Sequence, residues 1–208
     1  MKRLLAAALS ALLLLAAGCG SEPQPKDANL SKITIGLMPD TDSIPFIIAA
    51  ERGYFAEEGV EVELVPFKSA MERDAALQSG NLDGAISDLL AVIFARSGGF
   101  ALHATSYTDG NYNLVAGGNT GISTAPDLHG KEIAISRNTI IEYVTDEILA
   151  VNGLNEREVS KVVIPQIPVR LEMLQSGNLA AAVLPEPMAS VAVASGSRYV
   201  TGSGELGI

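Results

Sequence analysis

"LQSGNLDGAI" runs from Leu77 to Ile86, and "LQSGNLAAAV" runs from Leu174 to Val183. The six residues LQSGNL thus occur twice in a chain of 208 residues, at an offset of 97 positions. In each copy an amphipathic helix ends at Ser-Gly-Asn, where glycine takes the left-handed conformation that stops a helix, and a short apolar strand follows. The repeat predicts two halves built on one strand–helix–strand plan. The alternative is that LQSGNL is only an effective helix stop, used twice with no cleft between the halves.

The residues around each copy continue the alternation of short apolar runs with helical patterns. Such alternation predicts an α/β chain with parallel sheets and helices on both faces. The expected strands are 32–38, 60–65, 83–87, 131–136, 161–165 and 179–185, and the expected helices are 42–55, 69–81, 88–99, 138–153, 168–178 and 186–196.

Helix-start signals support three of these helices. Asp42 or Ser43 is expected to cap the first, and Pro45 fits its first turn. Two other helices have the spacing of a capping box, in which a hydroxyl and a glutamate three residues later bind each other's backbone amides. The expected pairs are Ser69 with Glu72 and Thr139 with Glu142.

Residues 1–18 have the pattern of a secretory signal peptide, because a basic pair precedes an apolar run at 4–17 that is too short for a comfortable transmembrane helix. The sequence LAAGC at 15–19 resembles the bacterial lipobox, in which the cysteine is lipidated and begins the mature chain. The alternative is an ordinary signal peptide with an incidental cysteine. Cys19 is the only cysteine, so no internal disulfide can form. Residues 19–31 are polar and predict a flexible tether to a lipid-anchored domain.

The composition predicts a packed and acidic domain. Hydrophobic residues make up 48% of the chain. The chain has 24 acidic and 14 basic residues, and two of the basic residues lie in the predicted signal peptide. Such an acidic body is a poor partner for nucleic acid. His103 and His129 lack neighbours at metal-ligand spacing, and there is no tryptophan for an aromatic cage. We therefore expect no metal, no cofactor and no nucleic-acid partner.

Four stretches carry a family resemblance: "KITIGLMPDTDSIPFIIAAERGYFAEEGVEVEL" (32–64), "ALQSGNLDGAISD" (76–88), "DLHGKEIAIS" (127–136) and "MLQSGNLAAAVLPEPMAS" (173–190). Together they resemble the type 2 periplasmic substrate-binding proteins of the nitrate, sulfonate, taurine and pyrimidine-precursor group, which are related to the thiamine-precursor synthases of yeast. The likeness covers 32–208, and "RGYFAEEG" and "LPEP" are its most specific motifs.

The resemblance implies a two-lobed α/β fold and a solute-binding lipoprotein outside the cytoplasm, anchored to the bacterial cell membrane. Such a protein delivers a small solute to the permease and ATPase of an ABC importer. Family members are longer, because the chain crosses to lobe two and then returns to complete lobe one. We expect lobe one at 32–110, lobe two at 111–194 and the start of the return at 195–208. Lobe one is therefore expected to be incomplete and to expose apolar surface.

Ligands of open α/β sheets bind at the carboxyl ends of strands, so the candidates lie in the loops that follow the predicted strands. The strand-end loops of lobe one supply Asp40, Thr41, Asp42, Ser43, Ser69, Ser87 and Asp88. The loops of lobe two supply Asn138, Thr139, Tyr143 and Glu186. Several have a structural alternative: Ser43, Ser69, Thr139 and Asp42 can serve as helix caps, and Glu186 and Asp88 can serve a helix dipole.

The expected ligand chemistry is mixed. Helix N-termini at Ser43, Ser69 and Thr139 favour an anionic or strongly accepting group. Four carboxylates crowd the same loops, however, and Arg137 is the only arginine expected there. Buried carboxylates need a cation or N–H donors. A zwitterion, an amine or an amino-heterocycle therefore fits better than bare nitrate or sulfate, and a sulfonate-like solute is not excluded.

An enzyme on the same fold is the opposing class of function. The yeast synthases use a histidine and a cysteine cluster, whereas this chain has one cysteine, at its predicted lipid end. No P-loop, Gly-rich dinucleotide turn or Ser-His-Asp arrangement occurs in the sequence. We therefore expect a binding protein and not an enzyme, and a tethered solute sensor stays open as the alternative.

Overall fold

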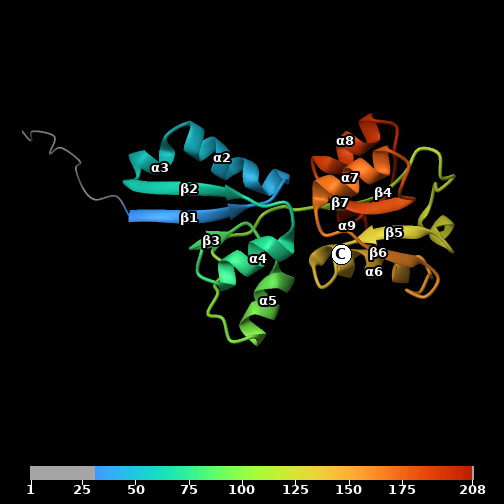
Figure 1. Ribbon diagram of the computed structural model, residues 1–208, viewed down its shortest axis with the longest axis horizontal. Coiled ribbons are helices and arrows are strands. Elements are labelled where there is room, and N and C mark those ends of the chain that lie inside the picture. Colours follow the sequence, from blue (N-terminus) through green and yellow to red (C-terminus); the bar gives the residue numbers. More distant parts are fainter. Residues whose placement is uncertain (1–30, 208) are drawn as a thin grey trace, which may run out of the picture. The chain divides into compact units, whose positions relative to one another are not determined.

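The computed structural model describes residues 31–207 (Figure 1). The predicted signal peptide, Cys19 and all of the predicted tether except Ser31 lie outside the described residues, so these assignments stay predictions. Among the described residues, no helix combines the length and the apolar character needed to cross a membrane.

The first sheet is entirely parallel, as predicted. It consists of β1 (Ser31–Leu37), β2 (Val60–Pro66) and β3 (Gly84–Ala85) in the order β2-β1-β3. The accompanying helices are η1 (Thr41–Ser43), α2 (Ile44–Glu51), α3 (Tyr54–Glu57), α4 (Ala70–Gln78) and α5 (Leu89–Ser97). Gly53 ends the helix predicted to begin at Asp42 or Ser43, as its place in the sequence suggests: it takes a left-handed φ of 77° after α2, and the short helix α3 follows it. We call residues 31–97 the first lobe.

The second sheet is mixed, which corrects the prediction of parallel sheets. Its strands are β4 (Tyr112–Ala116), β5 (Glu132–Ile135), β6 (Ser160–Val163), β7 (Ala181–Pro185) and β8 (Arg198–Gly202), in the order β6-β5-β7-β4-β8. Strand β5 runs parallel to β6 and β7, but β4 runs antiparallel to β7 and β8. Residues 98–111, which connect α5 to β4, contain no helix or strand. We call residues 112–207 the second lobe.

The helices of the second lobe are η2 (Ala125–Leu128), α6 (Ile140–Val151), α7 (Ile167–Gln175), α8 (Met188–Ala194) and α9 (Ser203–Leu206). We expected 195–208 to begin the return to lobe one. Within that segment, β8 pairs with β4 of the second sheet. The predicted boundaries of the lobes stay predictions.

The LQSGNL repeat has the predicted conformation in both lobes. Helices α4 and α7 stop at its Gln-Ser, and the repeat glycines have φ values of 77° (Gly80) and 75° (Gly177). The strand after each copy then joins its sheet in parallel beside β1 or β5. The repeat is therefore a shared strand–helix–strand plan, one copy in each lobe.

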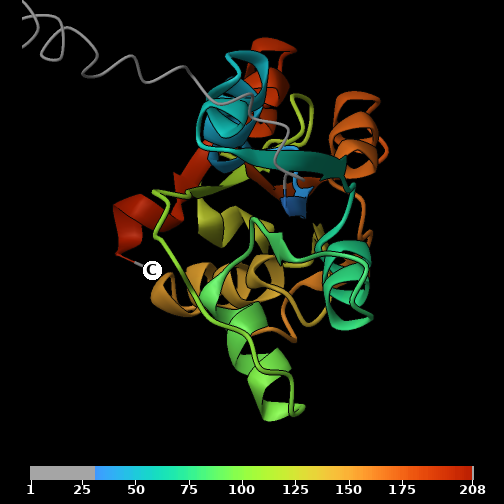
Figure 2. The same ribbon diagram turned by 90° about the vertical axis from the view of Figure 1, so that its left-hand side faces the viewer.

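The apolar core lies mostly in the second lobe. Apart from Met38, the buried members of both hydrophobic clusters come from the second lobe, and Phe67 is the one first-lobe residue packed against them. Helix α6 buries five residues, whereas α2 buries none and α5 buries only Ala95. Helix α5 is the lowest helix of the first lobe in Figure 1 and again lies at the lower edge in Figure 2.

Candidate functional site

Two cavities lie among the strand ends of the two lobes. The larger, of about 460 Å³, is bordered by Asp42 and Asp88 from the first lobe and by Tyr143 from the second. The smaller, of about 30 Å³, has Arg73 and Arg170 in its wall. The residues that border both cavities are Asp88, Tyr112 and Ile140. Because ligands of open α/β sheets bind at the carboxyl ends of strands, these cavities form the candidate site.

The structure brings about half of the predicted ligand residues to this site. Those that border one or both cavities are Asp40, Asp42, Ser87, Asp88, Thr139 and Tyr143. Those that do not border either cavity are Thr41, Ser43, Ser69, Asn138 and Glu186. For all of them, a direct contact with a solute remains a prediction.

Asp40, which is half-buried, and Ser43, which is buried, form a hydrogen-bonded corner after β1. The Asp40 carboxylate accepts hydrogen bonds from the Ser43 backbone N–H at 3.0 Å and from the Ser43 hydroxyl at 2.9 Å, and the Met38 N–H donates to the same hydroxyl. Ser43, one of the two expected caps, stands at the N-cap position of α2 but makes no side-chain capping bond there, whereas Asp40 caps the preceding 3₁₀ turn η1. Burial raises the pKa of Asp40, although the bonds from Ser43 oppose that change.

Asp42 instead turns to the larger cavity. Burial raises the pKa of its carboxyl, a hydrogen bond from Thr108 lowers it, and the charge of Asp109 raises it further. A carboxylate whose charge is disfavoured in this way gains from a cationic or N–H-donating neighbour. This side of the larger cavity therefore suits a donor group.

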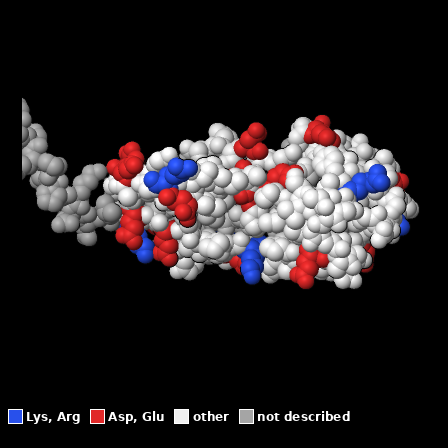
Figure 3. All heavy atoms as spheres, turned by 90° about the horizontal axis from the view of Figure 1, so that it is seen from above, with Lys and Arg blue, Asp and Glu red and all other residues white. Residues whose placement is uncertain are grey.

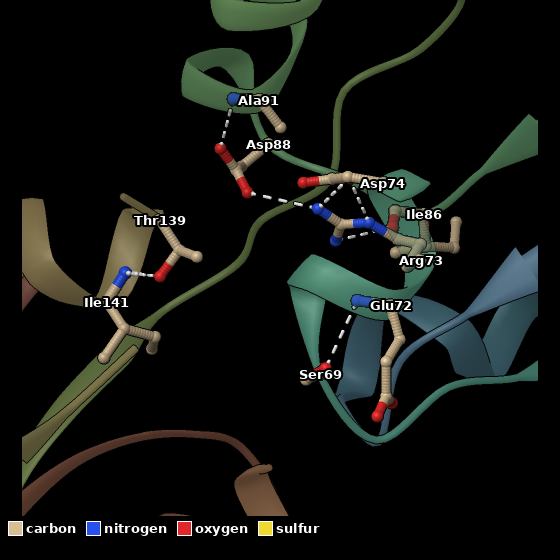
Figure 4. A network of polar contacts seen from close by, with 9 residues as sticks. All are labelled: Ser69, Glu72, Arg73, Asp74, Ile86, Asp88, Ala91, Thr139 and Ile141. Carbon is tan, nitrogen blue, oxygen red and sulfur yellow. Dashed lines mark hydrogen bonds and ion pairs between the residues drawn. The ribbon is translucent and has the colours of Figure 1, made fainter. Parts of the chain in front are cut away.

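Arg73 and Asp88 form the centre of the polar network in Figure 4. The Arg73 Nη1 donates to the carbonyl oxygen of Ile86 at 3.0 Å, its Nε donates to Asp74 at 2.9 Å, and its Nη2 lies 3.7 Å from the Asp88 carboxylate. Asp88 also caps α5 by accepting from the Ala91 N–H at 2.9 Å. Burial raises the pKa of Asp88 in spite of these partners, so the carboxylate is short of compensating donors.

Ser69 and Thr139 cap helices, which is the structural alternative that the sequence left open. Ser69 accepts from the Glu72 N–H and Thr139 accepts from the Ile141 N–H, as Figure 4 shows. The capping box expected between Thr139 and Glu142 is wrong, because the Glu142 carboxylate accepts from the Asn138 N–H instead. Thr139 borders the smaller cavity as well, whereas Ser69 does not.

Glu186 connects several elements near the site. Its carboxylate accepts from the Asn113 side-chain amide at 2.8 Å and from the Ser190 N–H at 3.1 Å, and its backbone carbonyl accepts from the Thr41 N–H at 2.9 Å. Since the Thr41 and Glu186 segments belong to different lobes, this backbone bond joins the lobes. A second such bond runs from the Ile167 N–H to the Lys68 carbonyl oxygen.

Sequence reasoning missed the two arginines of the smaller cavity. Arg137, the arginine expected at the site, is exposed and borders neither cavity. Arg73 and Arg170, by contrast, are 3% and 0% exposed. Both stand four residues before the leucine that opens a repeat copy, so their offset of 97 positions was the signal that could have found them.

Tyr112 was also missed. It stands at the start of β4 and borders both cavities. Burial, and after it the negative charges of Asp88 and Asp40, raises the pKa of its hydroxyl. The phenol is therefore a neutral donor at physiological pH, placed where the two cavities meet.

Comparisons with known proteins agree with this architecture. A family profile described as NMT1/THI5 like matches residues 40–185. Among solved structures, the chain is similar to the alkanesulfonate-binding protein SsuA from Xanthomonas axonopodis pv. citri bound to MOPS, with a TM-score of 0.71 and 19% identity over 86% of this chain and 63% of that one. A comparison with the sequences of curated proteins gives no match.

Two further solved structures show the same fold. The periplasmic aliphatic sulphonate-binding protein SsuA from Escherichia coli has a TM-score of 0.67 and 21% identity over 86% of this chain and 59% of that one. The periplasmic nitrate-binding protein NrtA from Synechocystis has a TM-score of 0.69 and 17% identity over 85% and 52%. The chain thus spans less than two thirds of the length of each of these structures.

The fold is that of a two-lobed type 2 periplasmic binding protein with an incomplete first lobe, as the sequence predicted. The chain belongs to the NMT1/THI5-like family.

Proposed function

We propose that this chain is a solute-binding lipoprotein outside the cytoplasm that takes up a small molecule and delivers it to an ABC permease and ATPase. The observation that carries this proposal is the 460 Å³ cavity, whose wall is built from strand ends and helix starts of both lobes. A cavity of that size suits a small solute. The similar structures are named as binding proteins for alkanesulfonate, aliphatic sulphonate and nitrate, which supports the same class of function here.

The membrane anchor is proposed from the sequence. Cys19 in its lipobox is the acylation site, and 19–31 is the tether. On the face in Figure 3, acidic side chains are scattered with basic ones between them, so the lipid is expected to provide the attachment. Mass spectrometry of the membrane-extracted protein should show a mature chain that begins at an acylated Cys19, and Cys19→Ala should abolish that mass.

The proposed solute carries a group that can donate to the carboxylates of the larger cavity. Asp42 and Asp88 border that cavity, and burial raises the pKa of both. A zwitterion, an amine or an amino-heterocycle meets this need, and a sulfonate that also carries a donor group meets it too.

The decisive experiment is denaturing mass spectrometry of the natively purified full-length protein, to detect a co-purified small molecule. A thermal-shift panel of sulfonates, amino acids and pyrimidines then tests binding, because a ligand at a hundred times its Kd adds about 2.7 kcal/mol to the free energy of unfolding. Asp88→Asn should remove the shift, and Glu51→Gln at the exposed end of α2 is the control that should retain it. A shift that survives in Asp88→Asn would exclude the carboxylate as a ligand contact.

A further inference from the structure

The two repeat copies place an arginine at the same point of each lobe. Arg73 is the fourth residue of α4 and Arg170 is the fourth residue of α7. Both side chains are buried, and both border the 30 Å³ cavity. The repeat therefore places two guanidinium groups in the wall of the same small cavity. A buried charge of this kind needs a partner.

The two arginines differ in how their charge is compensated. Arg73 contacts two carboxylates, those of Asp74 at 2.8 Å and Asp88 at 3.7 Å. Arg170 has no carboxylate partner among residues 31–207, and its Nη1 donates only to the carbonyl oxygens of Ile164 and Pro165. The positive charge of Arg170 is thus uncompensated by the described part of the protein.

The remaining donors of Arg170 are also free. Its Nε and Nη2 are buried and have no hydrogen-bond partner in the described chain, and the same is true of the buried Ser136 hydroxyl. Both residues border the smaller cavity. A buried donor without a partner costs roughly 1–3 kcal/mol, and more when the group is charged.

A purely structural role does not account for this arrangement. The hydrogen bonds to the carbonyl oxygens of Ile164 and Pro165 involve only the Nη1 of Arg170. They leave its positive charge unbalanced and its Nε and Nη2 donors without a partner among residues 31–207. Burial is the only cause that lowers the pKa of Arg170, to about 10, so the side chain remains a cation at neutral pH. Neutral water could fill the cavity and accept hydrogen bonds, but it would not balance the charge.

We infer that Arg170, together with the Ser136 hydroxyl that borders the same cavity, is the anchor for one anionic group of the solute. The Nε–Nη2 edge of a guanidinium matches the two oxygens of a carboxylate, sulfonate or phosphonate. Because the smaller cavity shares Asp88, Tyr112 and Ile140 with the larger one, the rest of the solute extends from this anchor into the 460 Å³ space. Arg73, already paired with Asp74 and Asp88, positions Asp88 and does not supply the anchor.

This inference rests on the proposed function and names the group that the same site recognises. The probes are matched pairs of small molecules that differ in charge: methanesulfonate with dimethyl sulfone, and acetate with acetamide, together with methylphosphonate. Isothermal titration of each into the full-length protein gives its affinity. We expect the wild-type protein to bind at least one anion and to bind its neutral counterpart at least tenfold more weakly.

Arg170→Lys keeps the charge but removes the two-donor edge, and should weaken the bound anion by roughly tenfold or more. Arg137→Lys, at an exposed arginine outside both cavities, is the matched control and should leave the affinity unchanged. Ser136→Ala removes a hydroxyl that has no hydrogen-bond partner within 31–207, so it should weaken anion binding while the unfolding midpoint stays the same. If Arg170→Lys does not fold, the anion affinity of Ser136→Ala tests the inference instead.

Three results would overturn the anchor: equal binding of charged and neutral probes, full anion affinity in Arg170→Lys, or full anion affinity in Ser136→Ala. In each case a solute still binds, so the proposed function survives without the inference. If no probe and no co-purified molecule binds the wild-type protein, both fail together.

Discussion

The two lobes share a strand–helix–strand plan but differ in how well they bury their apolar residues. In the second lobe, Leu114, Val115 and Leu184 are completely buried between five strands and their helices. In the first lobe, a three-stranded sheet leaves Leu89, Ile93 and Phe94 of α5 more than half exposed. A cavity of about 280 Å³ also lies between α4, α5 and the segment that follows them.

This difference shows that the helix stop of the LQSGNL repeat, and the strand after it, can form in a lobe whose apolar core is incomplete. Gly80 and Gly177 have the same backbone conformation although their lobes are packed very differently. The large apolar surface of α2 and α5 is the kind of surface that proteins normally cover. The first lobe should therefore contribute less to the free energy of unfolding than the second, and substitutions matched between the lobes can test that statement.

The largest contrast is expected between two leucines. Leu114→Ala removes a completely buried side chain from the second-lobe core and should lower the free energy of unfolding by about 2–5 kcal/mol. Leu89→Ala in α5, where the side chain is 57% exposed, should cost less than about 0.5 kcal/mol. Urea unfolding of both full-length variants measures the difference. Equal losses would mean that α5 is covered in solution, and the comparison between the lobes would fail.

The next contrast concerns two lysines. Lys161, in the second lobe, is 13% exposed and lies within ion-pair distance of Asp146, Glu142 and Glu156. Burial alone would lower its pKa, but the hydrogen bond and charge of Asp146, together with the two glutamates, raise it overall. Lys161→Met should therefore destabilise the protein by about 1–3 kcal/mol.

The matched control for that lysine is in the first lobe. Lys32 pairs with Glu63, but both side chains are more than half exposed. Exposed pairs contribute little because water already solvates the charges. Lys32→Met should leave the melting temperature unchanged within error, and a loss comparable to that of Lys161→Met would contradict the expected difference between the lobes.

The repeat glycines should respond alike in spite of the difference in packing. Both have left-handed φ values and no heavy atom within 4 Å of an added Cβ, so the backbone strain is the whole cost. Gly80→Ala and Gly177→Ala should each cost about 1–2 kcal/mol. If differential scanning calorimetry resolves two transitions, each substitution should lower the transition of its own lobe. Unequal costs would show that the two stops are not equivalent.

The smallest contrast is a pH dependence of opposite sign in the two lobes. Burial raises the pKa of Asp88 above its ordinary value of 3.8, so the wild-type protein loses stability as pH rises through that window. Asp88→Asn has no such loss, and its stability relative to wild type should increase with pH.

Asp127 of the second lobe provides the opposite case. Hydrogen bonds from the Ser123 and Thr124 N–H groups lower its pKa below 3.8. Its contribution is present above that value and is lost as pH falls. The stability of Asp127→Asn relative to wild type should therefore decrease with rising pH. Thermal melts from pH 3 to 7 measure both variants, and parallel curves would contradict the assigned pKa directions.

Much of the fold could be predicted because its signals are local. The helix stops at Gly80 and Gly177 depend on a few neighbouring residues, and so does the Ser69 cap. The predictions were wrong where the structure depended on which of several neighbouring residues caps a helix, or on which distant strand a strand pairs with. Asp40, and not Asp42 or Ser43, makes the side-chain capping bond after β1, and β4 runs antiparallel to β7 and β8, which are distant from it in the sequence.

The sequence by itself determined the duplicated α/β plan, the family, and the strand ends at which polar residues gather. Only the tertiary structure decided which of those residues reach the cavities. It also decided that the Glu186 carbonyl accepts a hydrogen bond from the Thr41 N–H of the other lobe. Finally, it decided that carboxylates balance the charge of Arg73 and that none balances the charge of Arg170 within the described residues. The physical reason is that helix stops are set by hydrogen bonds a few residues apart. The environment of a buried charge depends instead on strands and helices that are distant in the chain and meet only after folding.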